Sequence, residues 1–194
     1  TFVNAVLLRG LPIDDPERVL VVRMFNRVQS STSGVSYLDY RDLRDTSRSF
    51  AGLALHRDAT MNVSEQGRSP DRYLGTYLTA NGFGLLGQSP ALGREFRPED
   101  DVRGAPAVVI LADSVWRNRY GSDPSVIGRA IRVNEVPAIV IGVMPTGFRF
   151  PQNSDLWLPT SGIRDLETQA RSDRGFNAFG RLAPGVTAEQ AEAE

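Results

Sequence analysis

The chain has 194 residues, of which 41% are hydrophobic and 23% are charged, a composition typical of a soluble globular protein. Its net charge of -1 provides no basic surface for a phosphate backbone, so nucleic acid is not an expected partner. The length is large for one ordinary domain and small for two. We therefore expect one large domain or two closely joined subdomains.

Two residue types that carry much of protein chemistry are missing. Without any Cys, the chain has no disulfides, no thiolate metal sites and no thiol nucleophile. Every one of the 22 basic residues is Arg, which excludes a phosphate-binding loop with its Lys and any Schiff-base enzyme. The sole histidine is His56.

The two ends of the sequence predict a segment of a longer protein. No stretch reaches the roughly 18 apolar residues of a membrane span, and no signal peptide precedes the first strand. The chain opens within an apolar run and closes soon after Thr187-Ala188-Glu189-Gln190, which has the form of a helix capping box. We therefore expect the 194 residues to be an excised part of a larger polypeptide.

The first half of the sequence predicts an alternation of strands and one helix. Residues 19–25 form a β-branched apolar run, and Ser36 is positioned to cap a helix. Further strands are expected at 50–57, 60–64 and 72–79, with the turn-rich letters EQGRSPD before the last.

The second half predicts another unit of the same kind. Residues 107–111 read as a strand, and a helix capped by Asp113 or Ser114 should end at Gly121. A last strand at 176–182 then precedes the helix that Thr187 caps.

The stretch VIGRAIRVNEVPAIVIGVMPTGFRFP predicts a β-hairpin, because each of its apolar runs alternates with a period of two. Asn134-Glu135 is a plausible tight turn, and Pro137 belongs at a sheet edge or a bulge. The exit loop should be anchored by Phe148 and Phe150. The side chains predicted in the hairpin core are Ile131, Val133, Ile139, Ile141 and Val143.

The segment 82–87 matches the glycine pattern of a dinucleotide site, G-x-G-x-x-G. That fingerprint requires the third glycine at the start of a helix, whereas Ser89-Pro90 and Gly93 interrupt any helix here. The simpler interpretation is a short helical turn capped by Asn81, and we expect no bound cofactor.

His56 is the one candidate for a catalytic base, with Ser and Asp residues available for a triad. No G-x-S-x-G elbow is present, and the strand pattern places His56 beside Ala54, opposite Leu53 and Leu55. A surface imidazole is the favoured interpretation, and a Ser/His hydrolase using His56 stays open as the weaker alternative.

The acidic run Glu99-Asp100-Asp101 is similar to a calcium loop in composition only, since the spacing of an EF-hand is missing. We expect a solvated loop and no metal site. The sequon Asn62-Val63-Ser64 has meaning only in a eukaryotic secretory route, for which there is no sign.

A series of short motifs follows in a fixed order across nearly the whole chain. They are Leu7-Leu8-Arg9, Leu11-Pro12, Asp15-Pro16, Val35-Ser36-Tyr37-Leu38-Asp39, Asn81 to Gly87, Pro90, Leu92-Gly93-Arg94, Ser114-Val115-Trp116-Arg117, Tyr120-Gly121, Val126-Ile127-Gly128-Arg129, Ile141-Gly142-Val143-Met144-Pro145, Gly147-Phe148-Arg149-Phe150-Pro151, Asp155-Leu156-Trp157-Leu158-Pro159, Gly180-Arg181-Leu182 and Pro184-Gly185-Val186-Thr187. In this order the motifs resemble the periplasmic core domain of MacB-type ABC transporter permeases of the FtsX-like group. Gly82 and Gly84 depart from that family, because bulkier or polar residues are expected there.

The resemblance implies an α+β fold in which a mixed α/β subdomain, called Sabre, is inserted into a porter-like α/β subdomain. Residues 1–88 and 166–194 would form the porter-like part, and residues 89–165 the Sabre-like part. It also implies a segment outside the cytoplasmic membrane, in an inner-membrane protein, between its first and second transmembrane helices.

The function that the resemblance implies is non-enzymatic. ATP would bind only to a separate ATPase subunit or domain, and the outer domains of a permease homodimer or heterodimer would move on a substrate protein, an export substrate or a periplasmic adaptor. A freestanding extracytoplasmic module that binds a ligand or protein is the open alternative. No catalytic, metal, cofactor or partner-binding residue is assigned.

Overall fold

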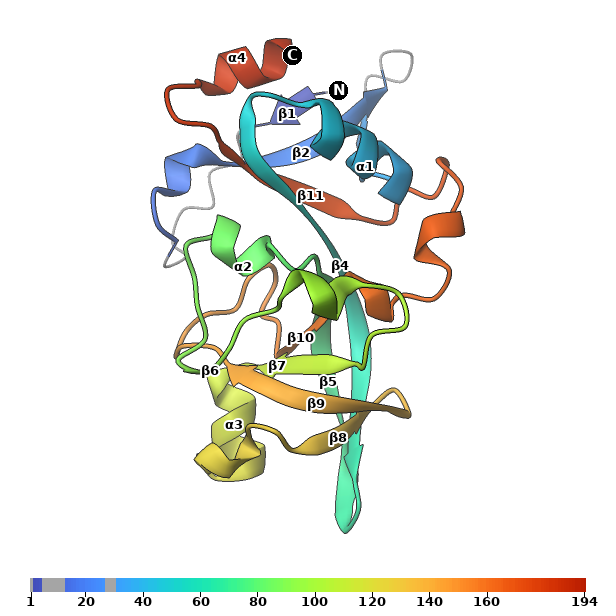
Figure 1. Cartoon of the computed structure of the whole chain (residues 1–194), viewed down its shortest axis with the longest axis vertical. Helices are drawn as coiled ribbons and strands as arrows, with labels where there is room; N and C mark the ends of the chain where they lie inside the picture. Colours follow the sequence, from blue (N-terminus) through green and yellow to red (C-terminus); the bar gives the residue numbers. More distant parts are fainter. Residues whose placement is uncertain (1, 5–12, 27–30) are drawn as a thin grey trace. The chain divides into compact units, whose positions relative to one another are not determined.

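The computed structural model describes residues 2–4, 13–26 and 31–194 and divides into two compact units. The motifs Leu7-Leu8-Arg9 and Leu11-Pro12 lie outside the described residues. Unit 1 comprises Thr1–Arg57, Asn81–Gln88 and Arg164–Glu194, and unit 2 comprises Asp58–Ala80 and Ser89–Ile163. The mixture of helices with parallel and antiparallel strands confirms the α+β class (Figure 1).

Unit 1 is built on an antiparallel sheet with the strand order β1-β2-β11-β4, and β3 also pairs with β2. Its strands are β1 (Phe2–Asn4), β2 (Val19–Asn26), β3 (Ser31–Ser33), β11 (Asn177–Leu182) and the first part of β4 (Phe50–Glu65).

The helices of unit 1 begin where the sequence places polar caps. Ser36 accepts a hydrogen bond on its hydroxyl from the backbone N–H of Asp39 at 3.0 Å, which confirms the predicted helix start. The helices are α1 (Tyr37–Thr46), α2 (Gly82–Leu85), α4 (Ala188–Ala193) and the 3₁₀ turns η1 (Pro16–Arg18) and η5 (Leu166–Thr168).

Unit 2 has a mixed sheet. It continues from β4 in the order β5-β10-β7-β9-β6, with β8 paired to both β4 and β9. The pairs β10/β5 and β7/β9 are parallel. Its strands are β5 (Arg68–Leu78), β6 (Leu92–Gly93), β7 (Val108–Leu111), β8 (Ala130–Val133), β9 (Val136–Val143) and β10 (Leu156–Pro159), and its helices are α3 (Asp113–Tyr120), η2 (Pro98–Asp101), η3 (Pro124–Val126) and η4 (Thr160–Gly162).

The core of unit 2 is closely packed around Trp157, which is fully buried. Its ring centroid lies 5.5 Å from that of Phe148, and its indole N–H donates to the carbonyl of Phe150 at 2.9 Å. Both phenylalanines are buried, so the predicted anchoring of the exit loop is confirmed.

Two of the segments that carry the family resemblance pair with each other in this sheet. Gly93 in β6 pairs with Gly142 in β9, and a side chain at Gly93 would collide with the carbonyl of Ile141. Close approach of the two backbones therefore requires glycine there. Next to it, Arg94 forms a two-pronged ion pair with Asp100, at 2.6 and 3.1 Å.

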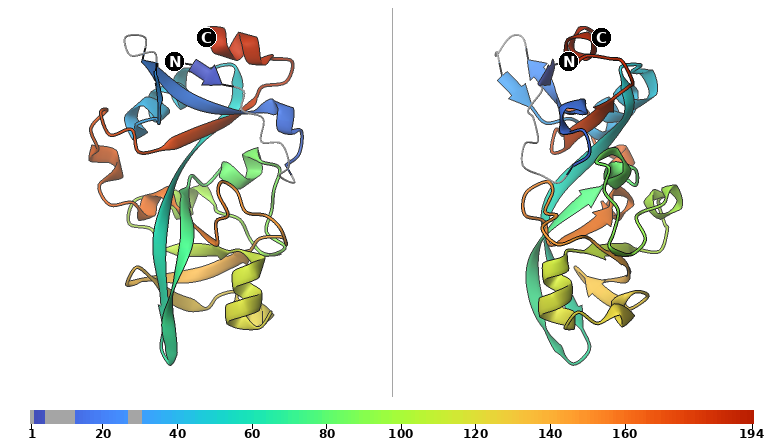
Figure 2. Two further views of the ribbon diagram at one scale, coloured as in Figure 1. Left: turned by 180° about the vertical axis from the view of Figure 1, so that it is seen from behind. Right: turned by 90° about the vertical axis from the view of Figure 1, so that its left-hand side faces the viewer.

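The strands predicted at 50–57 and 60–64 are in fact one strand, β4, with 16 residues. The charged Asp58 does not interrupt it, because its carboxylate accepts a hydrogen bond from Thr76 of β5 at 2.9 Å. The expected turn-rich segment shrinks to the tight turn at 66–67, since β5 already begins at Arg68. The resulting long hairpin is visible in Figure 2.

The β4–β5 hairpin also makes the division into two units differ from the subdomain bounds that the family resemblance implies. The family resemblance assigns all of residues 1–88 to the porter-like part, whereas Asp58–Ala80 packs within unit 2. The sequence carries no boundary at Asp58, because β4 passes from one unit into the other as a continuous strand. The change back to unit 1 after Ala80 coincides with the end of β5 and the start of α2.

The hairpin of β8 and β9 has the predicted turn, with positive φ at Asn134 and Glu135. The predicted core position of Ile139 is wrong, because 37% of this residue is exposed. The cause is a bulge: β7 pairs Val109 with Val140 but Ile110 with Gly142. Ile141 is the extra residue of this bulge, and it shifts the alternation of buried and exposed side chains along β9. Ala138 and Val140 are buried before the bulge, and Ile141 and Val143 are buried from the bulge onward.

The start of α3 differs from its prediction in a similar local way. The N-cap is Ala112, and no side chain caps this end, so neither Asp113 nor Ser114 has that role. The backbone of Ala112 is instead tied to the sheet through a hydrogen bond to the carbonyl of Asp155 at 2.8 Å. The end of α3 at Gly121, with a φ of 62°, is as predicted.

Candidate functional site

The first and last described elements of the chain lie together in unit 1. Strand β1 contacts helix α4, and the two elements lie side by side in Figures 1 and 2. Both segments rest on β2: β1 pairs with it directly, and α4 packs on its Leu20. A displacement of either end would therefore reach the same strand.

Helix α4 is held to the sheet by few apolar contacts. Ala191 is its one buried residue, and it packs with Leu20 and Leu182. The predicted capping box is confirmed: Thr187 N–H donates to the side chain of Gln190 at 2.9 Å, and Gln190 N–H donates to the Thr187 hydroxyl at 3.3 Å. Small side chains give α4 little buried area, so polar contacts carry much of its attachment.

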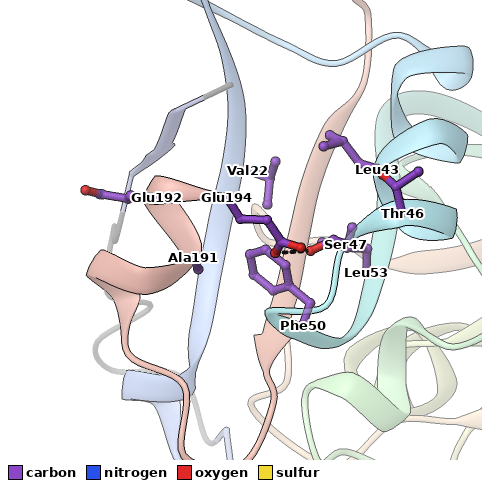
Figure 3. Close-up of a pocket in the computed structure, with 9 residues that line it drawn as sticks. All are labelled: Val22, Leu43, Thr46, Ser47, Phe50, Leu53, Ala191, Glu192 and Glu194. Carbon is purple, nitrogen blue, oxygen red and sulfur yellow. Dashed lines mark hydrogen bonds between the residues drawn. The ribbon is translucent and has the colours of Figure 1, made fainter.

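A cavity of about 250 Å³ lies beside α4 in unit 1 (Figure 3). Its lining comes from β2, from the end of α1, from the turn that follows, from β4 and from α4, and it is apolar apart from two hydroxyls and two carboxylates. The lining residues are Val22, Leu43, Thr46, Ser47, Phe50, Leu53, Ala191, Glu192 and Glu194.

Glu194 bridges the end of α4 to the turn between α1 and β4. Its carboxylate accepts hydrogen bonds from the Ser47 hydroxyl at 2.8 Å and from the backbone N–H groups of Arg48 and Ser49 at 2.7 and 2.9 Å. The Ser49 side chain has the largest effect, followed by the backbone N–H of Arg48, and together with the other donors they lower the pKa of Glu194 to about 2. We call this set of three hydrogen bonds the Glu194 clasp.

His56 is not at the surface, so the favoured interpretation of the sequence is wrong. It is 7% exposed, and its ring centroid lies 6.1 Å from that of Phe179. Both faces of β4 are covered here, because Leu53, Ala54 and Leu55 are buried as well. His56 does not line the cavity beside α4.

The glycine pattern at 82–87 does not have the geometry of a dinucleotide site. It forms the single helical turn α2, and Gly87 follows the helix with a φ of 66° instead of opening one. Phe83 and Leu86 are buried and hold this turn in the core. The side chain of Asn81 does not cap this turn but donates to the carbonyl of Leu53 at 2.9 Å.

The acidic run at 99–101 is not a freely solvated loop, which corrects the prediction. Asp100 pairs with Arg94, and Asp101 accepts three hydrogen bonds, from Ala80 N–H at 3.1 Å and from the Thr160 hydroxyl and Ser161 N–H at 2.8 Å each. Burial raises the pKa of Asp101, while those hydrogen bonds oppose the shift. The two aspartates join η2 to η4 within unit 2.

Unit 2 contains a buried ion cluster that no sequence pattern marks. Arg119 of α3 pairs with Glu65 at 3.3 Å and with Asp71 across the β4–β5 hairpin, and Arg129 pairs with Glu65 at 2.9 Å. The Tyr120 hydroxyl also donates to Glu65, at 3.1 Å, and burial together with that carboxylate raises the pKa of Tyr120 to about 12. The cluster fastens α3 to the hairpin.

Over the part of the chain that the structure describes, no group of three His, Cys, Asp or Glu side chains could hold a metal ion. Within the same residues, no helix is long and apolar enough to cross a membrane.

Comparison with known proteins identifies the family. The model of the MacB-like periplasmic core domain matches residues 2–194, so the chain belongs to that family, whose domains are extracytoplasmic parts of ABC-type permeases.

A curated relative, the macrolide export ATP-binding/permease protein MacB of Burkholderia thailandensis, is 31% identical over 80 residues. That match covers 40% of this chain and 12% of the relative, so the chain corresponds to a small part of that protein's length.

Three solved structures share the fold. The periplasmic region of MacB from Actinobacillus actinomycetemcomitans has a TM-score of 0.71 at 18% identity, with 96% of this chain and 84% of that one covered. A domain of a putative permease from Porphyromonas gingivalis gives 0.70 at 16%, covering 89% and 78%. The extracellular domain of the ABC-type transporter YknZ from Gram-positive bacteria gives 0.64 at 14%, covering 89% and 88%.

Proposed function

We propose that this domain acts without chemistry of its own and transmits motion. Within a MacB-like permease, ATP-driven movement of the transmembrane helices would pass through β1 and α4 into unit 1. The domain would use that movement to export a substrate or to engage a partner, while ATP binds to a separate ATPase subunit or domain.

The observation that carries this proposal is the meeting of β1 and α4 on one sheet. A domain placed between two membrane helices must receive the chain and return it on the same side. The Glu194 clasp adds a second attachment, from the end of α4 to the turn before β4. Both routes lead into the sheet of unit 1.

The two units fit the two subdomains that the family resemblance implies. We propose that unit 1 is the porter-like part and that unit 2 is the Sabre-like part, with the β4–β5 hairpin belonging to the latter. The partners would be an ABC ATPase subunit, a second permease copy or a related permease, and a periplasmic adaptor or substrate protein.

The residues that the sequence offers as catalytic candidates are engaged in packing contacts and hydrogen bonds that stabilise the fold. His56 is buried against Phe179, the carboxylate of Asp100 pairs with Arg94, and that of Asp101 joins η2 to η4. These placements support a non-catalytic role over a Ser/His hydrolase. A freestanding ligand-binding module stays the second candidate, because the cavity beside α4 has the lining of a small-molecule site.

The proposal is tested by loosening the connection between α4 and the segment that follows it. A Gly-Ser-Gly insertion directly after Glu194 in the full-length permease should abolish export while leaving the ATPase activity of the transporter unchanged. The same insertion at the exposed Gly67 turn, between β4 and β5, is the matched control and should preserve export. Undiminished export with the insertion after Glu194 would rule out transmission through α4.

A further inference from the structure

The cavity beside α4 has room for a small organic molecule. A cavity of about 150 Å³ lined by apolar side chains is enough to bind benzene, and this one measures about 250 Å³. Its wall includes the buried Val22 and Leu53 and the partly buried Phe50. One six-membered ring or a branched chain, together with a short polar group, fits this space.

The charge at the cavity comes from Glu194. The groups that act on its carboxylate are the hydroxyls of Ser47 and Ser49 and the backbone N–H groups of Arg48 and Ser49, and all are uncharged. A carboxylate has about four acceptor positions, and of the three hydrogen bonds of the clasp Oε1 receives one, from Arg48. With its pKa lowered to about 2, the group carries its negative charge at any physiological pH.

The second carboxylate of the lining provides a contrast. In Figure 3 the side chain of Glu192 leads away from the cavity, whereas that of Glu194 extends across it toward Ser47 and Phe50. Glu192 in α4 and Glu194 directly after it therefore carry the same charge but point in opposite directions.

We propose that this cavity binds a compact apolar molecule that carries a protonated amine. The apolar part lies against Val22, Phe50 and Leu53, and the ammonium group lies on the open side of the Glu194 carboxylate. Such a ligand contacts α4 through Ala191 and Glu194 and the rest of unit 1 through β2 and β4, so it fastens α4 to the sheet. This binding activity goes beyond the proposed transmission of motion and does not depend on it.

The test uses three probes of one size: benzylamine, which is cationic, benzyl alcohol, which is neutral, and benzoate, which is anionic. Each is titrated into the purified 194-residue chain, and binding is followed by the NMR shifts of the Ala191 and Leu53 amides. Benzylamine should bind about 10-fold more tightly than benzyl alcohol, as expected for a hydrogen bond to a charged group. Benzoate should bind most weakly.

Glu194→Gln should remove the preference for benzylamine, while the matched control Glu192→Gln should change its affinity by less than about 2-fold. Leu43→Trp, which fills the cavity from α1 and leaves the clasp intact, should abolish binding of all three probes and decides the question if Glu194→Gln unfolds. Equal affinities for the three probes, binding that survives Leu43→Trp, or no amide shifts with any probe at about 10 mM would each overturn the proposal.

Discussion

The two units of the domain are stabilised in different ways. In unit 2, β7 and β10 are buried along their whole length, Trp157 is fully enclosed, and the Arg119 cluster ties α3 to the hairpin. In unit 1, α4 has one buried alanine, a cavity beside it and a clasp of three hydrogen bonds at its end.

The difference indicates which part of the molecule can respond to force or to a ligand. Segments with few buried apolar contacts open at low free-energy cost, whereas a dense core moves as one body. We therefore expect unit 2 to behave as a rigid body and α4 to be the adjustable element of unit 1. The predictions that follow test this contrast, beginning with the largest expected effect.

Trp157→Ala should destabilise unit 2 by about 3–5 kcal/mol, because it empties a fully buried site and removes the donor to the Phe150 carbonyl. The remaining tryptophan, Trp116, also lies in unit 2, so its fluorescence in denaturant melts follows that unit. A loss below about 1 kcal/mol would mean that the core of unit 2 is not densely packed.

Ile141→Ala should cost about 2–5 kcal/mol, while Ile139→Ala should cost less than about 1 kcal/mol because Ile139 is exposed by the bulge in β9. Arg132→Ala, on the exposed face of β8, should also have a small effect. Urea melts of the three variants measure these differences. Equal losses for the two isoleucines would show that the bulge is misplaced.

Arg119→Met should cost about 2 kcal/mol, less than the 3–5 kcal/mol typical of breaking a buried ion pair, because Glu65 keeps Arg129 and Tyr120. Arg129→Met is the control: its side chain is 43% exposed, so about 0–1 kcal/mol is expected. The melts are compared at neutral pH. A larger loss for Arg129→Met would reverse the roles assigned to the two arginines.

The smallest effect is expected in unit 1. Because the folded state lowers the pKa of Glu194 to about 2, its stabilisation is complete above the unfolded pKa of about 4.5 and is lost as the pH falls toward 2. Glu194 is largely solvated, so we expect about 1 kcal/mol. Far-ultraviolet circular dichroism melts at pH 7 and pH 3 should show a larger difference between the parent chain and Glu194→Gln at pH 7 than at pH 3, where part of the stabilisation has been lost. An equal difference in stability between the two proteins at both pH values would show that the ionised Glu194 carboxylate does not stabilise unit 1.

Much of the fold could be predicted from local patterns. The caps at Ser36 and Thr187, the turn at Asn134-Glu135 and the end of α3 at Gly121 depend on neighbouring residues, and each is found as expected. The absence of Lys and Cys, which is a property of composition alone, excludes whole classes of enzyme.

Features that depend on distant partners could not be predicted. The continuity of β4 through Asp58 depends on Thr76, and the exposure of Ile139 depends on a bulge against β7. The burial of His56 depends on the covering of both faces of its strand.

The candidate site could not be predicted for the same reason. The cavity and the Glu194 clasp join β2, α1 and β4 to α4, which are far apart in the sequence. No local pattern marks the glutamate that follows α4, and the same is true of Glu65 and Arg119 in unit 2. Only the folded chain brings these groups together.

The central claim, that α4 carries motion between the membrane helices and the domain, has one direct test. These 194 residues contain no cysteine, so in a full-length transporter with any cysteines elsewhere replaced, Glu192→Cys places a single spin label per permease copy on the outer side of α4. Electron–electron distances between the labels of the two permease copies can then be measured in the full-length transporter, with and without bound ATP. We predict a distinct shift of the distance distribution on ATP binding, and superimposable distributions would contradict the claim.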